Sequence, residues 1–408
     1  MDTQNYFPEP AKKPNIPVPA GMNLVWNHNT GRWAFRPVSG YSTAYLKKDS
    51  FVPKRNVQPK PETEETNSEN GRNKSLHKAR KEKNDEFYTR LEDIVEELKH
   101  YKEHFQGKVV YCPCDKAFNL GRSNFVQFFI EHFVDWGLKK LVATQYNEDG
   151  RGWKWVVERG DVNGNGYIDE SEIDTYQLYG NGDFASDECR QIMNECDIVV
   201  TNPPFSLFSP FVTQIMELGK KFLIIGNHNA ITLKEIFPLL KNNKMWLGYR
   251  SLGRDMFFQI TDDYKKQIVK EKKEGSGWKV VDGEVMGRVA NACWFTNLNH
   301  DKRQEGIYCP ARYKGREDKY PFYDDYNAIE IGHYTRNGKW QGSLDELPSD
   351  YDGVMGVPIT FLEHYSPEQF EILGIANNAR YIGDFPCITI INGNPVYNRL
   401  LIRRKKAN

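Results

Sequence analysis

The sequence predicts an α/β fold in which one central sheet is doubly wound, with helices covering both of its faces. Four segments space their apolar residues as one face of a helix does: 91–105, 123–136, 187–195 and 208–218. Short apolar runs lie between them, and Asp197–Thr201 and Phe222–Gly226 are apolar almost without interruption. Such strands are typical of parallel sheets covered on both faces. The alternation predicts a doubly wound sheet, whose ligands bind at the carboxyl ends of the strands.

Further strands are expected on either side of these two. Short β-rich runs predict three of them, at 108–112, 141–144 and 153–157. The segments 245–249 and 292–298 are candidates for the last strands of the sheet. The charged stretch 261–290 between those segments is expected to leave the sheet as an excursion.

The remaining chain predicts three flanking regions around this central domain of residues 84–299. Residues 1–52 form a small N-terminal element, in which 23–38 predict a hairpin around the turn Asn29-Thr30-Gly31. Residues 53–83 are rich in Pro, Glu, Asn and Lys and predict a disordered basic linker. Residues 300–408, rich in Tyr, Asn, Gly and Arg, form a separate C-terminal region.

Composition places the chain among globular proteins. Its 408 residues suffice for two to three domains, and 39% of them are hydrophobic and 27% charged. No apolar run approaches the roughly 18–20 residues of a membrane helix, and the N-terminus lacks the pattern of a signal peptide. The seven cysteines form no disulfide framework, which indicates reduced cysteines in a cytoplasmic protein.

The net charge is zero, but the basic residues gather in three runs at 72–83, 265–279 and 403–406. Local basic stretches can track the phosphates of a nucleic acid while the rest of the surface stays balanced. Each run can equally be a solvated face or tail, and the sequence leaves both interpretations open.

The segment with the clearest chemistry is the loop Asn202-Pro203-Pro204-Phe205, which follows the buried strand 197–201 directly. An aromatic amine is a poor nucleophile because its lone pair is delocalised into the ring. Two acceptors, the Asn202 side-chain oxygen and the Pro203 carbonyl, could bind its two hydrogens and localise that lone pair. Consecutive prolines hold the carbonyl rigidly, and the Phe205 ring can stack on a flipped base. The alternative is a simple turn after a strand.

This loop matches the catalytic motif of amino-group methyltransferases, Asp/Asn/Ser-Pro-Pro-aromatic. The resemblance becomes closer because several motifs occur in the order seen in EcoRI-type adenine-specific DNA methyltransferases. These are Asn84–Thr89, Cys112–Asp115, Gly180–Phe184, Thr201–Phe208, Gly226–Thr232, Trp294–Leu298, Gly356–Leu362 and Pro367–Glu371. The resemblance covers roughly residues 84–404. It implies a Rossmann-like class I methyltransferase sheet, S-adenosylmethionine as cofactor, and a C-terminal target-recognition region for double-stranded DNA.

The same resemblance implies which residues contact the cofactor. They are Phe87, Tyr88, Thr89, Cys114, Asp115, Asp183 and Phe184. Two features depart from the general methyltransferase pattern. No glycine-rich loop follows the first strand, since Gly121 is the first glycine after it. The second strand is followed by Gln145-Tyr146-Asn147-Glu148, so no carboxylate comes directly after it, and Asn147 or Glu148 could take that place. Asp115 and Asp183 could instead be turn or cap residues.

A separate motif at residues 161–172 fits an EF-hand calcium loop at every diagnostic position. Gly166 allows the sharp turn, and the expected ligands are Asp161, Asn163, Asn165, Tyr167, Asp169 and Glu172. Only a short helix over 171–178 is expected after the loop, and a strand precedes it. This favours a structural Ca²⁺ clip over a sensor. An Asn- and Gly-rich surface loop is the alternative.

The motifs leave several functions to compare. The favoured one is site-specific methylation of the N6 amino group of a flipped adenine in DNA, by a cytoplasmic monomer that needs no membrane. A cognate restriction endonuclease would not be required physically. An N4-cytosine, RNA or protein-glutamine methyltransferase shares the Asn-Pro-Pro-aromatic loop. A non-catalytic calcium-dependent binding module is the alternative from a different class.

Overall fold

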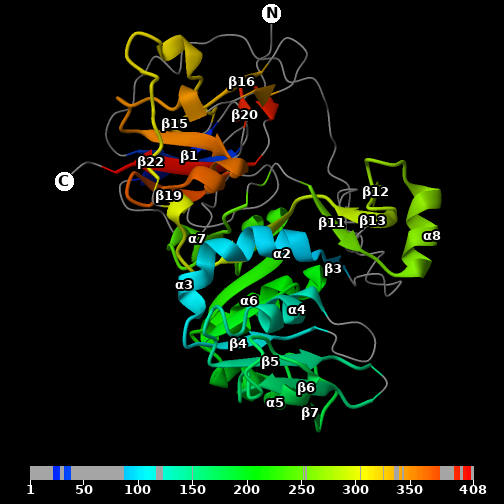
Figure 1. Ribbon diagram of the computed structural model, residues 1–408. Coiled ribbons are helices and arrows are strands. Elements are labelled where there is room, and N and C mark those ends of the chain that lie inside the picture. Colours follow the sequence, from blue (N-terminus) through cyan, green and yellow to red (C-terminus); the bar gives the residue numbers. More distant parts are fainter. Residues whose placement is uncertain are drawn as a thin grey trace, which may run out of the picture. The chain divides into compact units, whose positions relative to one another are not determined.

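The chain is described from a computed structural model (Figure 1). The described residues are 22–27, 32–37, 87–115, 123–148, 150–250, 252, 255–303, 305–324, 326–334, 340–341, 344–376, 390–395 and 398–405. The chain divides into two compact units, residues 69–305 and residues 1–68 with 306–408. The expected linker 53–83 and the basic run 72–83 lie outside the described residues.

The unit of residues 69–305 is built on an eight-stranded sheet of order β10-β14-β9-β8-β4-β5-β6-β7. The four central strands, β9, β8, β4 and β5, are parallel, and the outer strands are antiparallel. The strands are β4 Val109–Cys112, β5 Lys140–Gln145, β6 Trp153–Val157, β7 Asp174–Gln177, β8 Ile198–Thr201, β9 Lys221–Asn227, β10 Trp246–Leu247 and β14 Ala292–Thr296. The expected α/β fold is confirmed, and the two candidates for its last strands form β10 and β14, which the structure shows to be antiparallel.

Helices lie between the strands of this unit along the chain. They are α2 Leu91–Leu98, α3 Lys102–Phe105, α4 Asn124–Glu131, α5 Asp187–Glu195, α6 Phe208–Glu217, α7 Phe237–Lys241 and α8 Asp262–Glu271. Short 3-10 helices add η2 Lys99–Tyr101, η3 Glu170–Glu172, η4 Phe205–Leu207, η5 His228–Thr232 and η6 Asp301–Arg303. The helix expected over 123–136 ends at Glu131, and its remaining apolar residues lie in turns. The helix expected over 91–105 is interrupted by η2.

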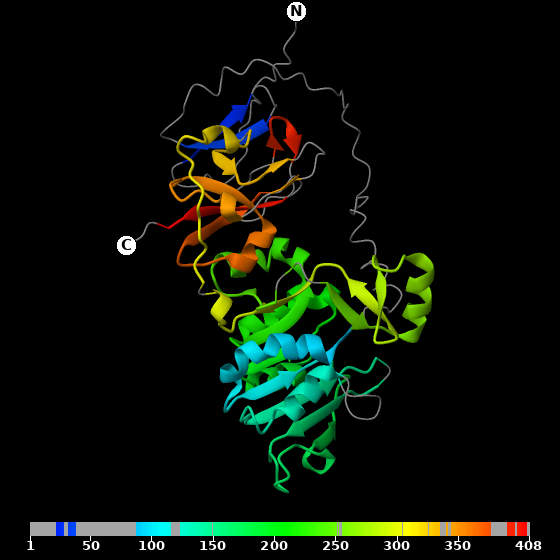
Figure 2. The same ribbon diagram turned by 45° about the horizontal axis from the view of Figure 1, so that its top comes forward.

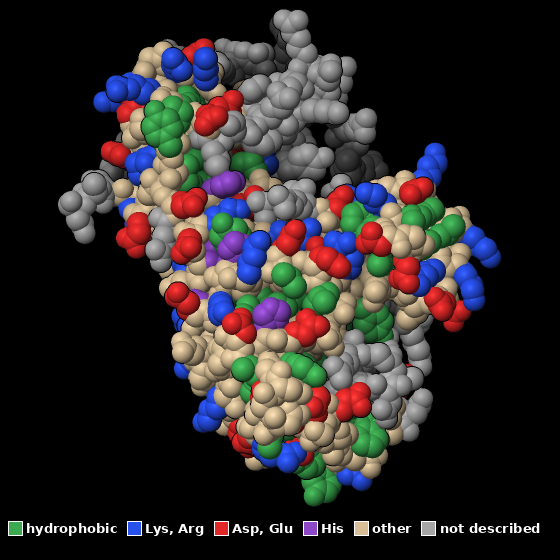
Figure 3. Space-filling model, viewed as in Figure 1, with side chains coloured by type: hydrophobic (Ala, Val, Ile, Leu, Met, Phe, Trp, Pro, Cys, Tyr) green, Lys and Arg blue, Asp and Glu red, His purple; other side chains and the backbone are tan. Residues whose placement is uncertain are grey.

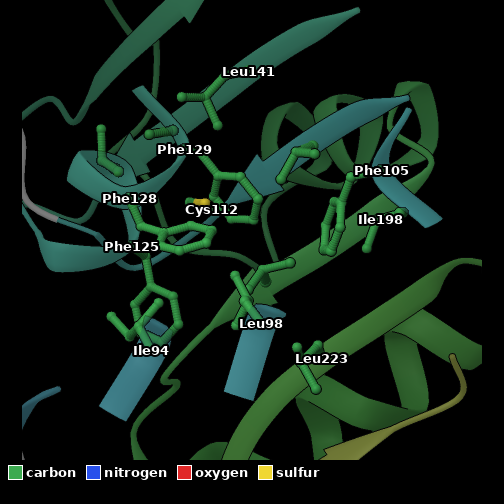
Figure 4. Close-up of a cluster of buried hydrophobic side chains, with 14 of the residues drawn as sticks. Ile94, Leu98, Phe105, Cys112, Phe125, Phe128, Phe129, Leu141, Ile198 and Leu223 are labelled. Atoms are coloured by element: carbon green, nitrogen blue, oxygen red, sulfur yellow. The ribbon is translucent and has the colours of Figure 1, made fainter. Parts of the chain in front are cut away.

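The main core lies where α2 and α4 pack on one face of the sheet. Figure 4 shows Phe125, Phe128 and Phe129 of α4 beside Ile94 and Leu98 of α2. All five side chains are at most 3% exposed. Because each buried side chain of this size contributes roughly 1.5–3 kcal/mol, this contact fixes α2 and α4 on the sheet.

The prediction of a short helix over 171–178 is wrong. The structure forms η3 and then β7, whose residues pair with β6 in the register Trp153↔Gln177 and Lys154↔Tyr176. A helix of two turns has little stability by itself. The neighbouring edge of β6 instead offers backbone partners to the segment, so pairing between strands decides its conformation.

A smaller sheet of order β12-β13-β11-β3 stands beside the main one, and Figures 1 and 2 show it projecting with α8 from one side. Its strands are β3 Tyr88–Thr89, β11 Met256–Gln259, β12 Trp278–Val281 and β13 Glu284–Val289. The excursion expected at 261–290 is therefore α8 followed by the β12–β13 hairpin. Through β11 it pairs with β3, which lies about 170 residues earlier in the chain.

The second unit contains a four-stranded sheet of order β15-β18-β22-β19. Its strands are β15 Ala328–Glu330, β18 Val354–Pro358, β19 Phe370–Ala376 and β22 Arg399–Arg404. The smaller elements are β1 Met22–Asn27, β2 Arg32–Pro37, β16 His333–Tyr334, β17 Trp340–Gln341, β20 Ile390–Ile391, β21 Asn394–Pro395, η7 Glu317–Lys319, η8 Leu344–Glu346 and η9 Ile359–His364. The hairpin expected over 23–38 is confirmed by the pairing of β1 with β2. A buried ion pair, Arg399 Nε to Glu330 at 2.7 Å, lies within the sheet.

The described basic runs are partly neutralised by neighbours. In α8, Lys265 pairs with Asp262 at 3.2 Å, and in β22, Arg403 pairs with Glu371 at 2.6 Å. Arg404 lies over the Phe370 ring, 4.9 Å from its centroid. Figure 3 shows both signs of charge intermixed on the face in view. Among the described residues, no helix is long and apolar enough to cross a membrane.

Replacing Gly226 by Ala should destabilise the unit of residues 69–305. A Cβ at this position of β9 would lie 2.3 Å from the ring of Phe208, the buried first residue of α6. Overpacking of this kind typically costs about 1–3 kcal/mol. Denaturant unfolding measures it, with Gly180→Ala as the control, because a Cβ there meets nothing closer than Glu188 Oε2 at 3.8 Å. Equal stability of the two variants would contradict the packing described.

Candidate active site

The strand order of the main sheet reverses between β4 and β8, and the loops that follow these strands meet there. The hydroxyl of Thr201, the last residue of β8, faces two acceptors, Pro113 O at 2.5 Å and Asp115 Oδ2 at 3.0 Å. Asp115 follows β4 and also accepts a hydrogen bond from Ser123. In doubly wound sheets this reversal is where ligands bind. The structure therefore places the loop that starts at Asn202 at the expected position.

The Asn202 side chain has one bonded end and one open end. Its Nδ2 donates to the main-chain oxygen of Phe87 at 2.7 Å. Its Oδ1 is buried and has no hydrogen-bond partner within the described part of the chain. Leaving a buried acceptor unpaired costs about 1–3 kcal/mol. Such an oxygen is ready to accept a hydrogen bond from a bound N–H group.

The two prolines set the shape of the loop after Asn202. Pro203 is buried, and Pro204 has an extended backbone with φ −52° and ψ 127°. Phe205 then begins η4, in which Leu207 N donates to Pro204 O at 2.8 Å. The loop is therefore fixed at both ends, by β8 before it and by η4 and α6 after it.

An aromatic cluster surrounds the Phe87 ring. The ring centroids of Phe205 and Phe258 both lie 5.9 Å from that of Phe87, and that of Tyr264 lies 6.1 Å away. Phe258 is fully buried, whereas Phe87 and Phe205 are half-buried. Sequence reasoning missed Phe258 and Tyr264, because only the pairing of β11 with β3 brings them to Phe87.

Burial governs the titratable groups after β4. It raises the pKa of Asp115 from 3.8 to about 7, although hydrogen bonds from Ser123 and Thr201 act in the opposite direction. Burial also raises the pKa of the Cys114 thiol, and the charges of Asp115, Cys189 and Asp183 raise it further. Cys114 has a left-handed backbone, with φ 64°. Three of the residues expected to contact the cofactor, Cys114, Asp115 and Asp183, therefore lie near one another.

The loop at 180–184 packs against the end of β5. Asn147 N donates to Asn181 O at 2.8 Å, and a Cβ at Gly182 would lie 2.4 Å from Gln145 O. Asp183 is exposed, and its Oδ1 accepts from Ala185 N at 2.9 Å. Phe184 is 8% exposed and packs edge-on against Phe211, with ring centroids 5.0 Å apart.

The first expected cofactor segment lies in and beside β3. Tyr88 is half-buried and Thr89 is 4% exposed. Asn124 at the start of α4 donates from Nδ2 to Thr89 O at 2.7 Å. The segment from Phe87 to Thr89 is thus bound to α4, to β11 and to Asn202, which brings it to the catalytic loop.

The loop at 161–172 contains two glycines with a left-handed backbone, Gly164 at φ 75° and Gly166 at φ 92°. Asp161 accepts from the backbone N–H groups of Gly164 and Gly166, both at 2.7 Å. The buried Glu172 accepts from Val162 N at 2.6 Å. Over the described ranges, no group of three or more Asp, Glu, His or Cys side chains is arranged to hold a metal ion.

A class I sheet that presents an open amide acceptor, a Pro-Pro turn and an aromatic ring at its switch point has the architecture of an amino-group methyltransferase. The sequence matches the family described as the adenine-specific methyltransferase EcoRI over residues 75–405. The chain belongs to this family.

Curated relatives support this membership. The type II methyltransferase M.EcoRI of Escherichia coli is 39% identical over 346 residues, which cover 83% of this chain and 98% of the relative. The type II methyltransferase M.MpnI of Mycoplasma pneumoniae is 38% identical over 307 residues, which cover 74% of this chain and 86% of the relative. No solved structure matches the chain.

Replacing Asp115 by Asn should change how stability depends on pH. In the folded wild type, the pKa of Asp115 is raised from 3.8 to about 7. The wild-type protein therefore loses stability as the pH rises from about 4 to about 7, because the folded state disfavours the ionised carboxyl. The Asn variant lacks this loss. Its free energy of unfolding relative to the wild type should therefore increase by a few kcal/mol between pH 4 and 7 and level off above. Urea unfolding across this range measures the difference, and parallel curves would contradict the raised pKa.

Proposed function

We propose that this chain methylates the N6 amino group of adenine at a specific site in double-stranded DNA. The observation that carries the proposal is the buried Asn202 Oδ1, which has no partner within the described residues and lies at the switch point of the sheet. Membership of the adenine-specific family supports adenine as the base. The relatives are named type II methyltransferases, which supports DNA and a defined recognition site.

The proposed catalysis is orientation and polarisation of the amine. Asn202 Oδ1 accepts one hydrogen of N6, and the main-chain oxygen of Pro203 accepts the other. Both bonds draw the nitrogen lone pair out of conjugation and strengthen as positive charge develops on N6, which favours the transition state over the ground state. The half-buried Phe205 ring stacks on the flipped base. No strong base is needed before attack.

S-adenosylmethionine, when bound, supplies a methyl group on a sulfonium centre. The residues fit such a cationic cofactor because Asp115 is a buried carboxyl that carries no ion pair among the described residues and whose pKa lies near neutrality. A nearby positive charge would keep it ionised. We assign cofactor contacts to three segments: Phe87, Tyr88 and Thr89; Cys114 and Asp115; and Asp183 and Phe184.

The proposal extends to the regions that bind DNA and to the oligomeric state and partners of the enzyme. Residues 300–408 act as the target-recognition region, and the excursion at 261–290 lies over the DNA. The enzyme works as a cytoplasmic monomer, and a cognate restriction endonuclease need not bind it. Phosphate contacts by Lys and Arg would make the affinity for DNA fall with salt.

The direct test is single-molecule sequencing of DNA from cells that express the chain, beside cells that express Asn202→Ala. The wild type should mark adenine N6 at one recurrent motif. The variant should lose about 100-fold or more in rate, the typical effect of removing one transition-state hydrogen bond, while binding of S-adenosylmethionine persists. N4-methylcytosine in the same reads, or unmarked DNA from soluble wild-type protein, would overturn the proposal.

We also propose that the loop at 161–172 is a structural Ca²⁺ clip that stabilises the insertion between β6 and β7. The observation behind it is that the carboxylates of Asp161 and Glu172, the first and last ligand positions, both accept hydrogen bonds from backbone N–H groups of the loop. On binding, the carboxylate oxygens would turn from backbone N–H groups to the cation, which prefers six to eight oxygen ligands.

Millimolar Ca²⁺ should therefore raise the melting temperature of the protein by a few degrees, because a ligand that binds only the folded state stabilises it. Glu172→Gln should abolish the shift. Glu170→Gln should keep it, because position 10 of the loop offers no ligand. A melting curve that Ca²⁺ leaves unchanged, together with no binding heat, would show that the loop folds without metal.

A further inference from the structure

We propose that the main-chain carbonyl of Phe87 is a positioning group that decides which end of the Asn202 amide faces the substrate. This inference rests on the proposed function and deepens it. The segment Phe87–Thr89 would thus have two tasks, one toward the cofactor and one toward the catalytic amide.

An amide side chain needs such a group because its two ends have nearly the same shape. With Oδ1 toward the substrate, Asn202 can accept a hydrogen from an amine. If the amide is turned by 180°, Nδ2 meets the amine hydrogens, and donors oppose donors. The bond from Nδ2 to Phe87 O, at 2.7 Å, separates these two states. A turned amide would lose that bond and set two oxygens against each other.

Several contacts hold the Phe87 carbonyl in place. Tyr88 and Thr89 pair with Gln259 and Phe258 of β11. Asn124 binds Thr89 O at 2.7 Å, and the Phe87 ring packs against Phe205. The carbonyl therefore belongs to a fixed backbone, so the amide is oriented in advance of substrate binding. Preorganisation of this kind is what makes a polar group effective in a transition state.

Replacing Asn202 by Asp separates the acceptor role from the positioning role. Asp supplies an oxygen toward the substrate, and the general motif of amino-group methyltransferases includes it. In this chain its second oxygen would face the Phe87 carbonyl. An ionised carboxylate is repelled there, whereas a protonated one donates to Phe87 O and restores the geometry. The pH should therefore control the activity of this variant.

The experiment measures kcat of the full-length protein on a duplex that contains the motif found by sequencing, from pH 5.5 to 8.5. At pH 8, Asn202→Asp should be about 100-fold slower than the wild type. Its rate relative to the wild type should rise by up to tenfold for each unit of pH decrease. Asn202→Ala, the matched control, should be slow without this recovery. Equal melting temperatures and equal affinities for S-adenosylmethionine show that both variants fold.

Titratable groups also lie on the neighbouring elements. They are Tyr88 of β3, Asp115 after β4, His228 after β9 and Tyr264 of α8. All four are shared by the wild type and both variants, so the ratio of variant to wild-type rate removes the part of their contribution that does not depend on residue 202. Wild-type activity at pH 8 for Asn202→Asp, or a flat ratio like that of Asn202→Ala, would overturn the inference.

A second readout does not depend on methylation. In protein labelled with ¹⁵N at asparagine, the Asn202 side-chain resonance is identified by its loss in Asn202→Ala. Its hydrogen bonded to Phe87 O should exchange with solvent more than tenfold slower than those of exposed asparagines. Exchange at the rate of exposed asparagines would overturn the inference. If the wild type methylates no DNA, the proposed function fails, yet this measurement still tests the hydrogen bond from Asn202 Nδ2 to Phe87 O.

Discussion

The hydrogen bond from Thr201 to Asp115 joins the ends of the two strands between which the order of the main sheet reverses. It links the loop after β8 to the loop after β4, so Asn202 lies at the carboxyl ends of these two strands. The parallel pairing of β4 with β8 sets this edge, and the core beneath α2 and α4 holds it. Without the pairing of β4 with β8, the acceptors after β8 and the expected cofactor residues after β4 would lie apart.

The site also carries costs that the rest of the fold must offset. Asp115 is buried where its charge is disfavoured, and Asn202 Oδ1 is buried without a partner within the described residues. Each lowers stability in the free protein, by about 1–3 kcal/mol for the unpaired acceptor. The buried side chains of α2 and α4 supply the compensating free energy. Polar groups left open in this manner are typical of sites that receive a ligand.

Much of the fold could be predicted from local patterns. The four parallel strands, the helix 187–195 and the last two strands near 246 and 292 follow from periodicity and apolar runs. Local pattern also predicts a helix over 171–178, where the structure has η3 followed by β7, because the conformation of this segment depends on pairing with β6. Local propensity carries no information about a partner strand, so this error could not be corrected from the segment alone.

The chemistry of the site is local in sequence, and its geometry is not. The residues Asn202-Pro203-Pro204-Phe205 are consecutive and directly follow a buried strand, so the sequence alone indicates an amino-group methyltransferase. The carbonyl that orients Asn202 belongs to Phe87, and two rings of its cluster belong to Phe258 and Tyr264. These residues meet because β3 pairs with β11, and a backbone hydrogen bond between distant strands leaves no signature in side-chain patterns.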